Sequence, residues 1–184
     1  MAKIYVFLAD GCEEIEALTP VDIFRRAGED VETVSIMGRR EVTGSHKITI
    51  QADKKIEDGT FDDGDLLFLP GGMPGTLNLG ANEQLKELIL SYNRQGKRLA
   101  AICAAPSVLG GLGVLEGKQA VCFPGFEEQL KGAEVLRVPA VTSDNVTTGR
   151  GMGAAVDFAL EVLKQLQGAD AAAQMAEKIV YPYA

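Results

Sequence analysis

Unbroken apolar runs alternate with segments of helical periodicity along this chain. The apolar runs are typical of strands covered on both faces, and they span Lys3–Ala9, Val31–Ile36, Asp65–Leu69 and Leu99–Ile102. Apolar residues at helical spacing predict helices over Glu13–Ala27, Asn82–Gln95, Ser107–Leu112, Gly153–Gln167 and Ala169–Ile179. Strands and helices that alternate in this way favour an α/β fold, in which a mostly parallel sheet carries helices on both faces.

Shorter strands and one proline modify this alternation. Glu41–Val42 and Lys47–Gln51 predict a small hairpin that turns at Gly44-Ser45. Pro20 lies inside the first predicted helix, where we expect a kink or a new helical segment. Further short strands are predicted over Ala120–Phe123, over Glu134–Val138 and on either side of Asp144-Asn145 within Val141–Thr148.

Length and charge narrow the class of protein. The chain has 184 residues, of which 46% are hydrophobic, and this predicts a single domain with a substantial core over residues 1–184. Its net charge of -8 and its pI near 4.7 argue against nucleic acid or an anionic membrane as a partner. The first apolar run is too short to span a membrane and lacks the cleavage pattern of a signal peptide, so we expect a cytoplasmic protein.

The cysteines and the single histidine argue against several kinds of site. Cys12, Cys103 and Cys122 are odd in number and lack CxxC spacing, so a disulfide framework is not expected. One histidine, His46, without clustered cysteines argues against a zinc site. The segment Gly149–Gly153 precedes a predicted helix and could face an anion, but it lacks the spacing of a dinucleotide-binding loop. We therefore expect neither a metal nor a cofactor.

Cys103 directly follows a buried strand and precedes a predicted helix. This places it at the carboxyl edge of the sheet, where open α/β folds bind their ligands. Ala104 and Ala105 leave room for a tight turn, and the N–H groups at the start of the next helix favour a thiolate. The pattern matches a nucleophile elbow with cysteine in place of serine, so we expect Cys103 to be the most acidic and most oxidisable of the three thiols. The alternative is a buried cysteine that packs as a small apolar residue.

Acidic residues cluster directly after the first strand. With Ile15 and Leu18 taken as neighbours of the core, Glu16 is expected to lie deeper than the other acids, and it is the candidate for proton transfer. Glu13 and Glu14 fall in the first helical turn, where they complement the helix dipole. The alternative is that the three glutamates form a solvated face of the helix.

The only histidine is badly placed to activate the cysteine. His46 lies in the predicted hairpin, so we expect a position on the surface or at a pocket rim. Cysteine hydrolases use histidine as the base, and proton transfer here therefore falls to a carboxyl group or water. Gly71-Gly72 ends another predicted strand, and its backbone N–H groups would meet Cys103 and the acidic loop at one edge of the sheet.

Together these segments resemble the ThiJ/PfpI superfamily and, within it, the clade of the Parkinson-associated protein deglycase and bacterial YajL. The resemblance covers nearly the whole chain. It rests on Gly11–Glu16, Pro20–Asp22, Leu69–Gly72, Ala100–Pro106 and Thr148–Gly153. It implies a flavodoxin-like α/β sandwich and a homodimer.

The resemblance also implies roles for particular residues. Cys103 corresponds to the reactive, oxidation-prone cysteine, and Glu16 to the buried carboxylic acid that hydrogen-bonds it. Gly71, Gly72 and Ala104 match the residues whose backbone N–H groups form an anion pocket.

Three further positions follow from the same resemblance. His46 stands where some relatives carry an arginine at the pocket rim, and Arg26 falls at another rim arginine on the interface side. Phe123 stands where some members have a histidine near the cysteine, which argues against a Cys-His protease or amidotransferase.

The chemistry that the resemblance implies is aldehyde chemistry. We expect a cysteine-dependent glyoxalase or deglycase that acts on small 1,2-dicarbonyls such as glyoxal and methylglyoxal, or on their adducts. The reaction would pass through a hemithioacetal at Cys103, with Glu16 as the proton shuttle. The alternative is an oxidative-stress sensor or redox-regulated chaperone that responds through oxidation of Cys103.

Overall fold

A central sheet of seven strands organises the chain in the computed structural model, which describes residues 1–181. Its strands in sequence order are β1 (Lys3–Leu8), β2 (Asp30–Ser35), β5 (Lys54–Lys55), β6 (Leu66–Leu69), β7 (Arg98–Ile102), β10 (Ala140–Ser143) and β11 (Val146–Gly149). Their spatial order is β10-β11-β7-β6-β1-β2-β5, and every neighbouring pair is parallel except β10 with β11. The predicted mostly parallel sheet is confirmed.

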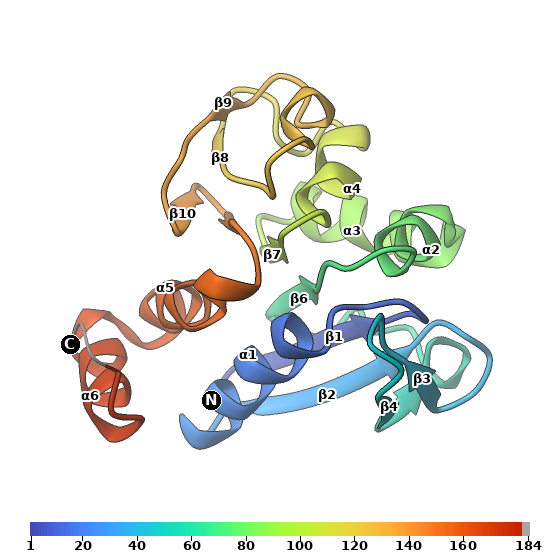
Figure 1. The fold of residues 1–184 in the computed structure, drawn as a ribbon, viewed down its shortest axis with the longest axis horizontal. Helices are drawn as coiled ribbons and strands as arrows, with labels where there is room; N and C mark the ends of the chain where they lie inside the picture. The colour runs from blue at the N-terminus through green and yellow to red at the C-terminus, as the bar shows by residue number, and fades with distance from the viewer. Residues whose placement is uncertain (182–184) are drawn as a thin grey trace.

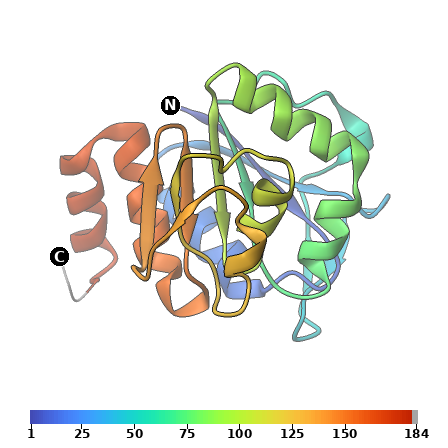
Figure 2. The same cartoon turned by 90° about the horizontal axis from the view of Figure 1, so that it is seen from above.

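Helices cover both faces of this sheet (Figure 1). They are α1 (Glu14–Arg26), α2 (Gly75–Ala81), α3 (Glu83–Arg94), α4 (Pro106–Gly111), α5 (Ala155–Gln167) and α6 (Ala169–Lys178). Helices α1 and α5 pack together on one face, and α2, α3 and α4 lie on the other. Helix α6 packs against the outside of α5 (Figure 2). This is the flavodoxin-like α/β arrangement that the sequence predicts.

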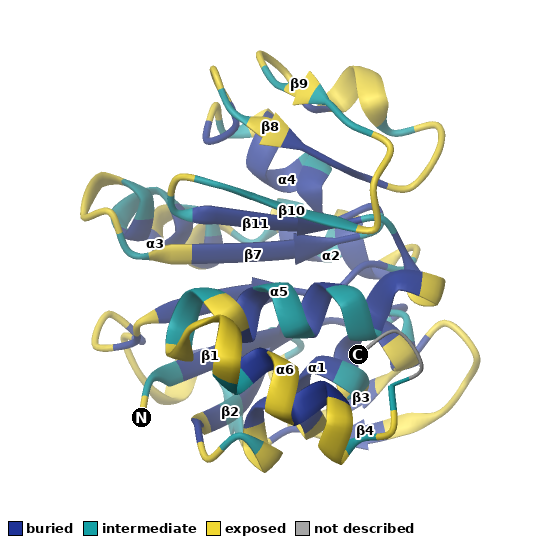
Figure 3. Ribbon diagram, turned by 90° about the vertical axis from the view of Figure 1, so that its left-hand side faces the viewer, coloured by how far each residue is buried: buried dark blue, intermediate teal, exposed yellow. Residues whose placement is uncertain are grey.

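Alternate side chains of each strand supply two separate cores. In β1, Tyr5 and Phe7 join the cluster that contains residues of α3 and α4. Ile4 and Val6 join the cluster that contains residues of α1 and α5. Because successive residues of a strand point to opposite faces, each central strand anchors both helical layers. The strands are accordingly buried along most of their length (Figure 3), which explains their unbroken apolar sequences.

The smaller elements lie outside the main sheet. The predicted hairpin is confirmed as an antiparallel pair, β3 (Glu41–Thr43) and β4 (Thr49–Gln51). The predicted short strands near residues 120 and 134 shrink to β8 (Gln119–Ala120) and β9 (Glu134–Val135), which pair in parallel. Single turns of 3-10 helix occur at η1 (Ile56–Asp58), η2 (Glu127–Gln129) and η3 (Met152–Ala154). Within residues 1–181, no helix is long and apolar enough to cross a membrane.

Two features of the helices differ from the expectations. Helix α1 starts no new segment at Pro20 but continues to Arg26, and Ala17, Val21 and Phe24 on either side of the proline are buried. Helix α2 was not predicted. It has only seven residues, too few to show a helical period, and two of these are glycine.

The direction of the chain crossovers reverses beside β1. The chain runs from β1 to β2 on one side and through β6, β7 and β11 on the other. Open α/β sheets bind ligands at the carboxyl ends of the strands at such a reversal. The loops that follow β1, β6 and β7 meet at this point, and they carry the predicted site residues.

Candidate active site

Cys103 occupies a left-handed turn at the carboxyl end of β7. Its φ is 66°, in a region that residues other than glycine rarely adopt. The Cys103 N–H donates to the Gly149 carbonyl at 2.9 Å, and the Cys103 carbonyl accepts from the Phe123 N–H at 2.8 Å. Ala104 and Ala105 are buried and lead into α4. The strand–turn–helix geometry expected around the cysteine is therefore present, and hydrogen bonds on both sides hold it.

Glu16 reaches the sulfur of Cys103 from the first turn of α1. Its side chain is 1% exposed and hydrogen-bonds the Cys103 thiol. The start of the helix is fixed by Glu13, whose Oε2 accepts from the Glu16 N–H at 2.7 Å. The buried carboxyl group and the half-buried thiol thus form a pair.

Glu16 is buried as expected, but the expectation that Ile15 and Leu18 neighbour the core is wrong. Ile15 and Leu18 do not face the core, because they are 47% and 39% exposed. Glu14 and Glu16 are 4% and 1% exposed, so the alternative of a solvated acidic face is also wrong for these two residues. Glu14 and Glu16 are two positions apart on α1 and face different neighbours, because Glu14 contacts His46 of the hairpin and Glu16 contacts Cys103.

The loop after β6 brings its backbone close to the pair. The N–H groups of Gly72 and Ala104 face the sulfur of Cys103, whereas the N–H of Gly71 faces the carboxyl group of Glu16. A Cβ at Gly71 would lie 2.5 Å from Glu16 Oε2 and 2.6 Å from Cys103 Cβ. The three expected N–H donors are therefore divided, two at the sulfur and one at the acid, and only glycine fits at Gly71.

The two groups oppose each other's ionisation. Burial raises the pKa of Glu16 to about 7, although its hydrogen bond to Cys103 lowers it. Burial and the negative charge of Glu16 raise the pKa of Cys103 to about 12, against the lowering effect of the nearby N–H groups. Near neutral pH the Cys103 thiol therefore keeps its proton while the Glu16 carboxyl group is partly ionised, and a thiolate forms when the thiol proton moves to ionised Glu16.

Burial also raises the pKa of the other two thiols, of Cys12 to about 12 and of Cys122 to about 11. Among the three, Cys103 is the one that faces two N–H groups and a carboxylic acid able to take its proton. The greater acidity expected of Cys103 stays a prediction.

One oxygen of the Glu16 carboxyl group lacks a partner. Glu16 Oε2 is buried and forms no hydrogen bond of good geometry with any residue of the described chain. A buried oxygen of this kind is stabilised when it carries the proton or when a bound molecule donates to it. The carboxyl group can therefore donate or accept a proton at this atom.

The hairpin that carries His46 folds over the loop after β1. The Ser45 N–H donates to the Cys12 carbonyl at 2.8 Å. His46 Nδ1 lies 2.9 Å from Glu14 Oε2, and the His46 N–H donates to Glu14 Oε1 at 2.7 Å. Burial alone would raise the pKa of Glu14, but His46 and nearby N–H groups lower it to about 2, and Glu14 in turn raises the pKa of His46. The contacts of His46 are thus with Glu14 rather than with Cys103.

Glu13, Glu14 and His46 also place possible metal-ligating atoms within 4.8 Å of one another. Their observed roles are structural, since Glu13 caps α1 and Glu14 ties the hairpin to the helix. The side chain of His46 is 70% exposed, which matches the expected surface position.

Arg26 lies far from this site. It is in the last turn of α1, ten residues after Glu16, which corresponds to about 15 Å of helical rise. Its guanidinium pairs with Asp22 at 2.6 Å on the surface. The expected position of Arg26 at the pocket rim is therefore wrong for the single chain.

Sequence analysis missed how the segment before α5 closes the site. The Met152 N–H faces the Glu16 carboxyl group. A Cβ at Gly151 would lie 3.2 Å from the ring of Phe123 and 3.9 Å from Glu16 Oε1. The signal in the sequence was the glycine-rich segment Gly149–Gly153, which could face an anion and whose Met152 N–H faces the Glu16 carboxyl group.

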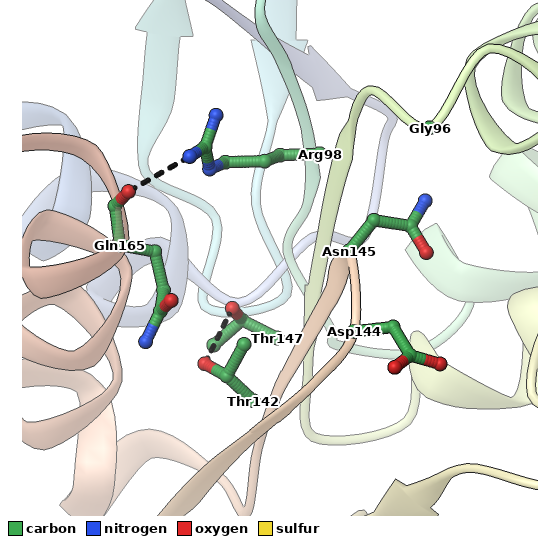
Figure 4. A pocket seen from close by; sticks show the side chains of 7 residues that line it. All are labelled: Gly96, Arg98, Thr142, Asp144, Asn145, Thr147 and Gln165. Atoms are coloured by element: carbon green, nitrogen blue, oxygen red, sulfur yellow. Dashed lines mark hydrogen bonds between the residues drawn. The ribbon is translucent and has the colours of Figure 1, made fainter.

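A second, polar pocket of about 350 Å³ lies at the amino ends of β7 and β11 (Figure 4). Arg98 donates to the Gln165 carbonyl at 2.9 Å, and the hydroxyl groups of Thr142 and Thr147 lie 2.9 Å apart. Its lining includes one carboxylate, Asp144, which pairs with Lys118 at 2.6 Å, and no cysteine or histidine. The pair of a cysteine and a buried carboxylic acid is therefore at the other edge of the sheet.

The fold and the site define an α/β protein with a cysteine–carboxylic acid pair at a strand-to-helix turn. The model of the DJ-1/PfpI family matches residues 2–165, and the chain therefore belongs to the DJ-1/PfpI family. The resemblance to the ThiJ/PfpI superfamily is thus confirmed.

Three relatives show how far the similarity extends. The Parkinson disease protein 7 homolog of Danio rerio is 34% identical over 185 residues, which cover 97% of this chain and 96% of that protein. Protein DJ-1 homolog B of Arabidopsis thaliana is 34% identical over 180 residues, and the match spans 97% of this chain but only 41% of that protein. The structure of Toxoplasma gondii DJ-1, oxidized, superposes with a TM-score of 0.95 at 33% identity and covers 100% of both chains.

Proposed function

We propose that this protein is a cysteine-dependent glyoxalase that converts small 1,2-dicarbonyls into 2-hydroxy acids and also acts on their adducts with amines or thiols. The observation that carries the proposal is the pairing of the half-buried Cys103 thiol with the buried Glu16 carboxyl group, while two N–H groups face the sulfur. The reaction needs a nucleophile, an oxyanion site and one group that both gives and takes a proton. The pair and its loops supply all three.

The first step is addition to the aldehyde. The sulfur of Cys103 forms a bond to the aldehyde carbon, and the electron pair of the carbonyl π bond moves to oxygen. The N–H groups of Gly72 and Ala104 stabilise the developing alkoxide, an effect typically worth about 3–4 kcal/mol per donor. Glu16 gives its proton to that oxygen, and the product is a hemithioacetal.

The second step moves a proton between the two carbons. The Glu16 carboxylate takes the proton from the carbon bonded to sulfur, the C–H electron pair forms a C=C bond, and the ketone oxygen becomes an enediolate. The proton of the hemithioacetal hydroxyl moves to that oxygen, and Glu16 returns its proton to the neighbouring carbon, which gives the thioester of a 2-hydroxy acid. Water adds to the thioester carbonyl, the carbon–sulfur bond breaks, and the thiol is restored. A pKa of about 7 suits Glu16 to both directions of transfer near neutral pH.

The test is turnover by the purified, reduced protein. We expect lactate from methylglyoxal and glycolate from glyoxal, loss of both products in Cys103→Ala, and wild-type rates in Cys122→Ala, which removes another buried thiol. Absence of hydroxy acid from the wild-type protein would contradict the proposal. With a glyoxal-modified amine, release of the amine faster than its spontaneous loss supports a deglycase, and equal rates restrict the activity to free dicarbonyls.

A specific observation also supports the redox alternative, because one relative was solved as oxidized DJ-1. Here the Cys103 thiolate attacks peroxide, the O–O bond breaks, water leaves, and a second peroxide takes the sulfenic acid to the sulfinic acid. Protonated Glu16 would donate to the sulfinate. Peptide mapping after mild peroxide should find sulfinate at Cys103 first, and prior oxidation of Cys12 or Cys122 would count against this role.

We further propose a cytoplasmic homodimer. The exposed Ile15 and Leu18 on α1 offer apolar side chains to a second copy. The three unpaired cysteines fit a reducing compartment. Light scattering should give twice the chain mass for the wild type and a smaller mass for Leu18→Lys, whereas a monomeric wild type would contradict the dimer.

A further inference from the structure

A groove with two arginines opens beside the Cys103–Glu16 pair. Its volume is about 560 Å³, and its walls include the exposed apolar side chains of Phe123, Val138 and Met152. Arg137 and Arg150 also line it. The groove is therefore amphipathic, with an apolar floor and cationic groups at its side.

The groove adjoins the site already described, although neither Cys103 nor Glu16 lines it. The Phe123 N–H donates to the Cys103 carbonyl at 2.8 Å. Gly151 lines the groove, and a Cβ at this position would lie 3.9 Å from Glu16 Oε1. The Met152 N–H faces the Glu16 carboxyl group. A molecule bonded to the sulfur would therefore reach the groove past Phe123 and Gly151.

The two arginines lack neutralising partners. Within residues 1–181, neither guanidinium forms a salt bridge or a side-chain hydrogen bond. Glu127 interacts electrostatically with both arginines, but its Oε2 already accepts from the Gly125 N–H at 2.6 Å. Asp157 also lines the groove. Two unpaired arginines beside a reactive cysteine are unexpected in a chain with a net charge of -8.

We propose that this groove is a specificity subsite for substrates that carry a carboxylate on an apolar stem. The inference rests on the proposed function. The dicarbonyl end would meet Cys103, the stem would lie on Phe123 and Met152, and the carboxylate would accept hydrogen bonds from Arg137 and Arg150. Guanidinium groups match a carboxylate through two parallel hydrogen bonds. Asp157 in the same groove disfavours the higher charge of a phosphate. Methylglyoxal would leave the groove empty.

The first test does not require turnover. It compares alkylation of Cys103 by 4-(bromomethyl)benzoate and by the neutral 4-(bromomethyl)benzamide, each rate divided by that of free N-acetylcysteine. Peptide mapping confirms that Cys103 is the residue modified. We expect the wild type to prefer the anionic reagent by about five- to tenfold, the range of one favourable charge contact.

Substitutions of the two arginines test whether the preference for the anionic reagent depends on the groove. Arg137→Gln and Arg150→Gln should each lower it, and the double variant should bring the ratio to one or below. Arg94→Gln, which removes an exposed arginine on α3, is the charge-matched control and should keep the wild-type ratio. A wild-type ratio near one, or an unchanged ratio in the double variant, would overturn the subsite.

The second test uses turnover and separates the two proposals. The ratio of kcat/KM for 4-carboxyphenylglyoxal to that for phenylglyoxal should fall in the arginine variants, mainly through KM. If alkylation shows the preference and neither glyoxal is turned over, the subsite stands and the proposed function fails. If both glyoxals are turned over with ratios that ignore the arginines, the function stands and the subsite fails.

Discussion

The pockets at the two ends of the sheet differ in how their polar groups are paired. At the amino end, Arg98 donates to a backbone carbonyl at 2.9 Å, and Asn145 does so at 2.8 Å (Figure 4). Thr142 Oγ1 lies 2.9 Å from Thr147 Oγ1 and donates to Glu161 Oε1 at 2.8 Å. These groups have their hydrogen-bonding needs met within the fold.

At the carboxyl end of the sheet, a buried polar group lacks a hydrogen-bond partner among residues 1–181. Glu16 Oε2 is buried without a partner, and Cys103 has a left-handed backbone conformation. Both features cost stability, and both leave a group ready to act on a bound molecule. The comparison teaches that pairing and backbone conformation, rather than the presence of a pocket, distinguish a reactive site from a polar surface hollow.

The largest effect on turnover is expected from a substitution of Cys103, and a substitution of Thr142 in the amino-end pocket is its control. Cys103→Ser should lower dicarbonyl turnover by at least about 10³-fold, because it replaces the nucleophile that forms the covalent intermediate. Thr142→Val removes a hydroxyl from the amino-end pocket and should leave turnover unchanged. Steady-state assays on both purified variants decide the comparison. Loss of activity in Thr142→Val alone would reverse our assignment of the site.

A pair of glycines tests how tightly each end is packed. Gly71→Ala would place a Cβ 2.5 Å from Glu16 Oε2 and 2.9 Å from the Ile102 carbonyl, so we expect a loss of about 1–3 kcal/mol in unfolding free energy and at least a tenfold loss of turnover.

Gly96→Ala at the amino end is the control. Gly96 has φ 67° and no atom within 4 Å of an added Cβ. Only the left-handed conformation is penalised, by about 1 kcal/mol, and turnover should not change. Urea unfolding and activity assays measure both effects, and equal activity in the two variants would contradict the close packing around Gly71.

The raised pKa of Glu16 predicts a pH-dependent stability. Its pKa is about 7 in the folded protein and 4.5 in the unfolded chain, so the unfolded state ionises first. Glu16 therefore costs the fold progressively more as pH rises from about 4.5 to 7, up to roughly 3 kcal/mol. Glu16→Gln cannot ionise and should gain this amount relative to the wild type across that range. Urea unfolding at several pH values measures the difference, which would stay constant if the folded pKa were ordinary.

The smallest expected effect concerns His46. Because its contacts are with Glu14 rather than with Cys103, His46→Ala should leave kcat within about threefold, equivalent to less than roughly 1 kcal/mol of transition-state stabilisation. Steady-state kinetics tests this. A loss of kcat by about a hundredfold, as expected for the loss of a general base, would favour a Cys-His mechanism instead.

Local signals in the sequence were enough to find Cys103. An apolar strand, small residues and a following helix are neighbours along the chain, so their arrangement in space follows from the sequence order. The same holds for the hairpin, whose turn at Gly44-Ser45 separates two short strands. The loops that end neighbouring strands offered Glu16 and Gly71-Gly72 as candidates, and the family resemblance supplied their roles beside Cys103.

Features that depend on tertiary packing were not predictable. Ile15 and Leu18 are as apolar as core residues, and periodicity alone does not say which side of α1 meets the sheet. The division of N–H groups between Cys103 and Glu16 depends on how two distant loops approach each other. The resemblance placed Arg26 at the rim, but the helical rise of α1 separates it from Glu16 within the chain.

The most direct test of the Cys103–Glu16 mechanism follows ¹³C-labelled methylglyoxal by NMR in the wild type, in Glu16→Gln and in Cys103→Ala. We expect the wild type to produce lactate, Glu16→Gln to hold a hemithioacetal carbon without forming lactate, and Cys103→Ala to show neither signal. This pattern would show addition by the thiol and proton transfer by the carboxyl group as separate steps. Formation of lactate at the wild-type rate by Glu16→Gln would contradict the mechanism.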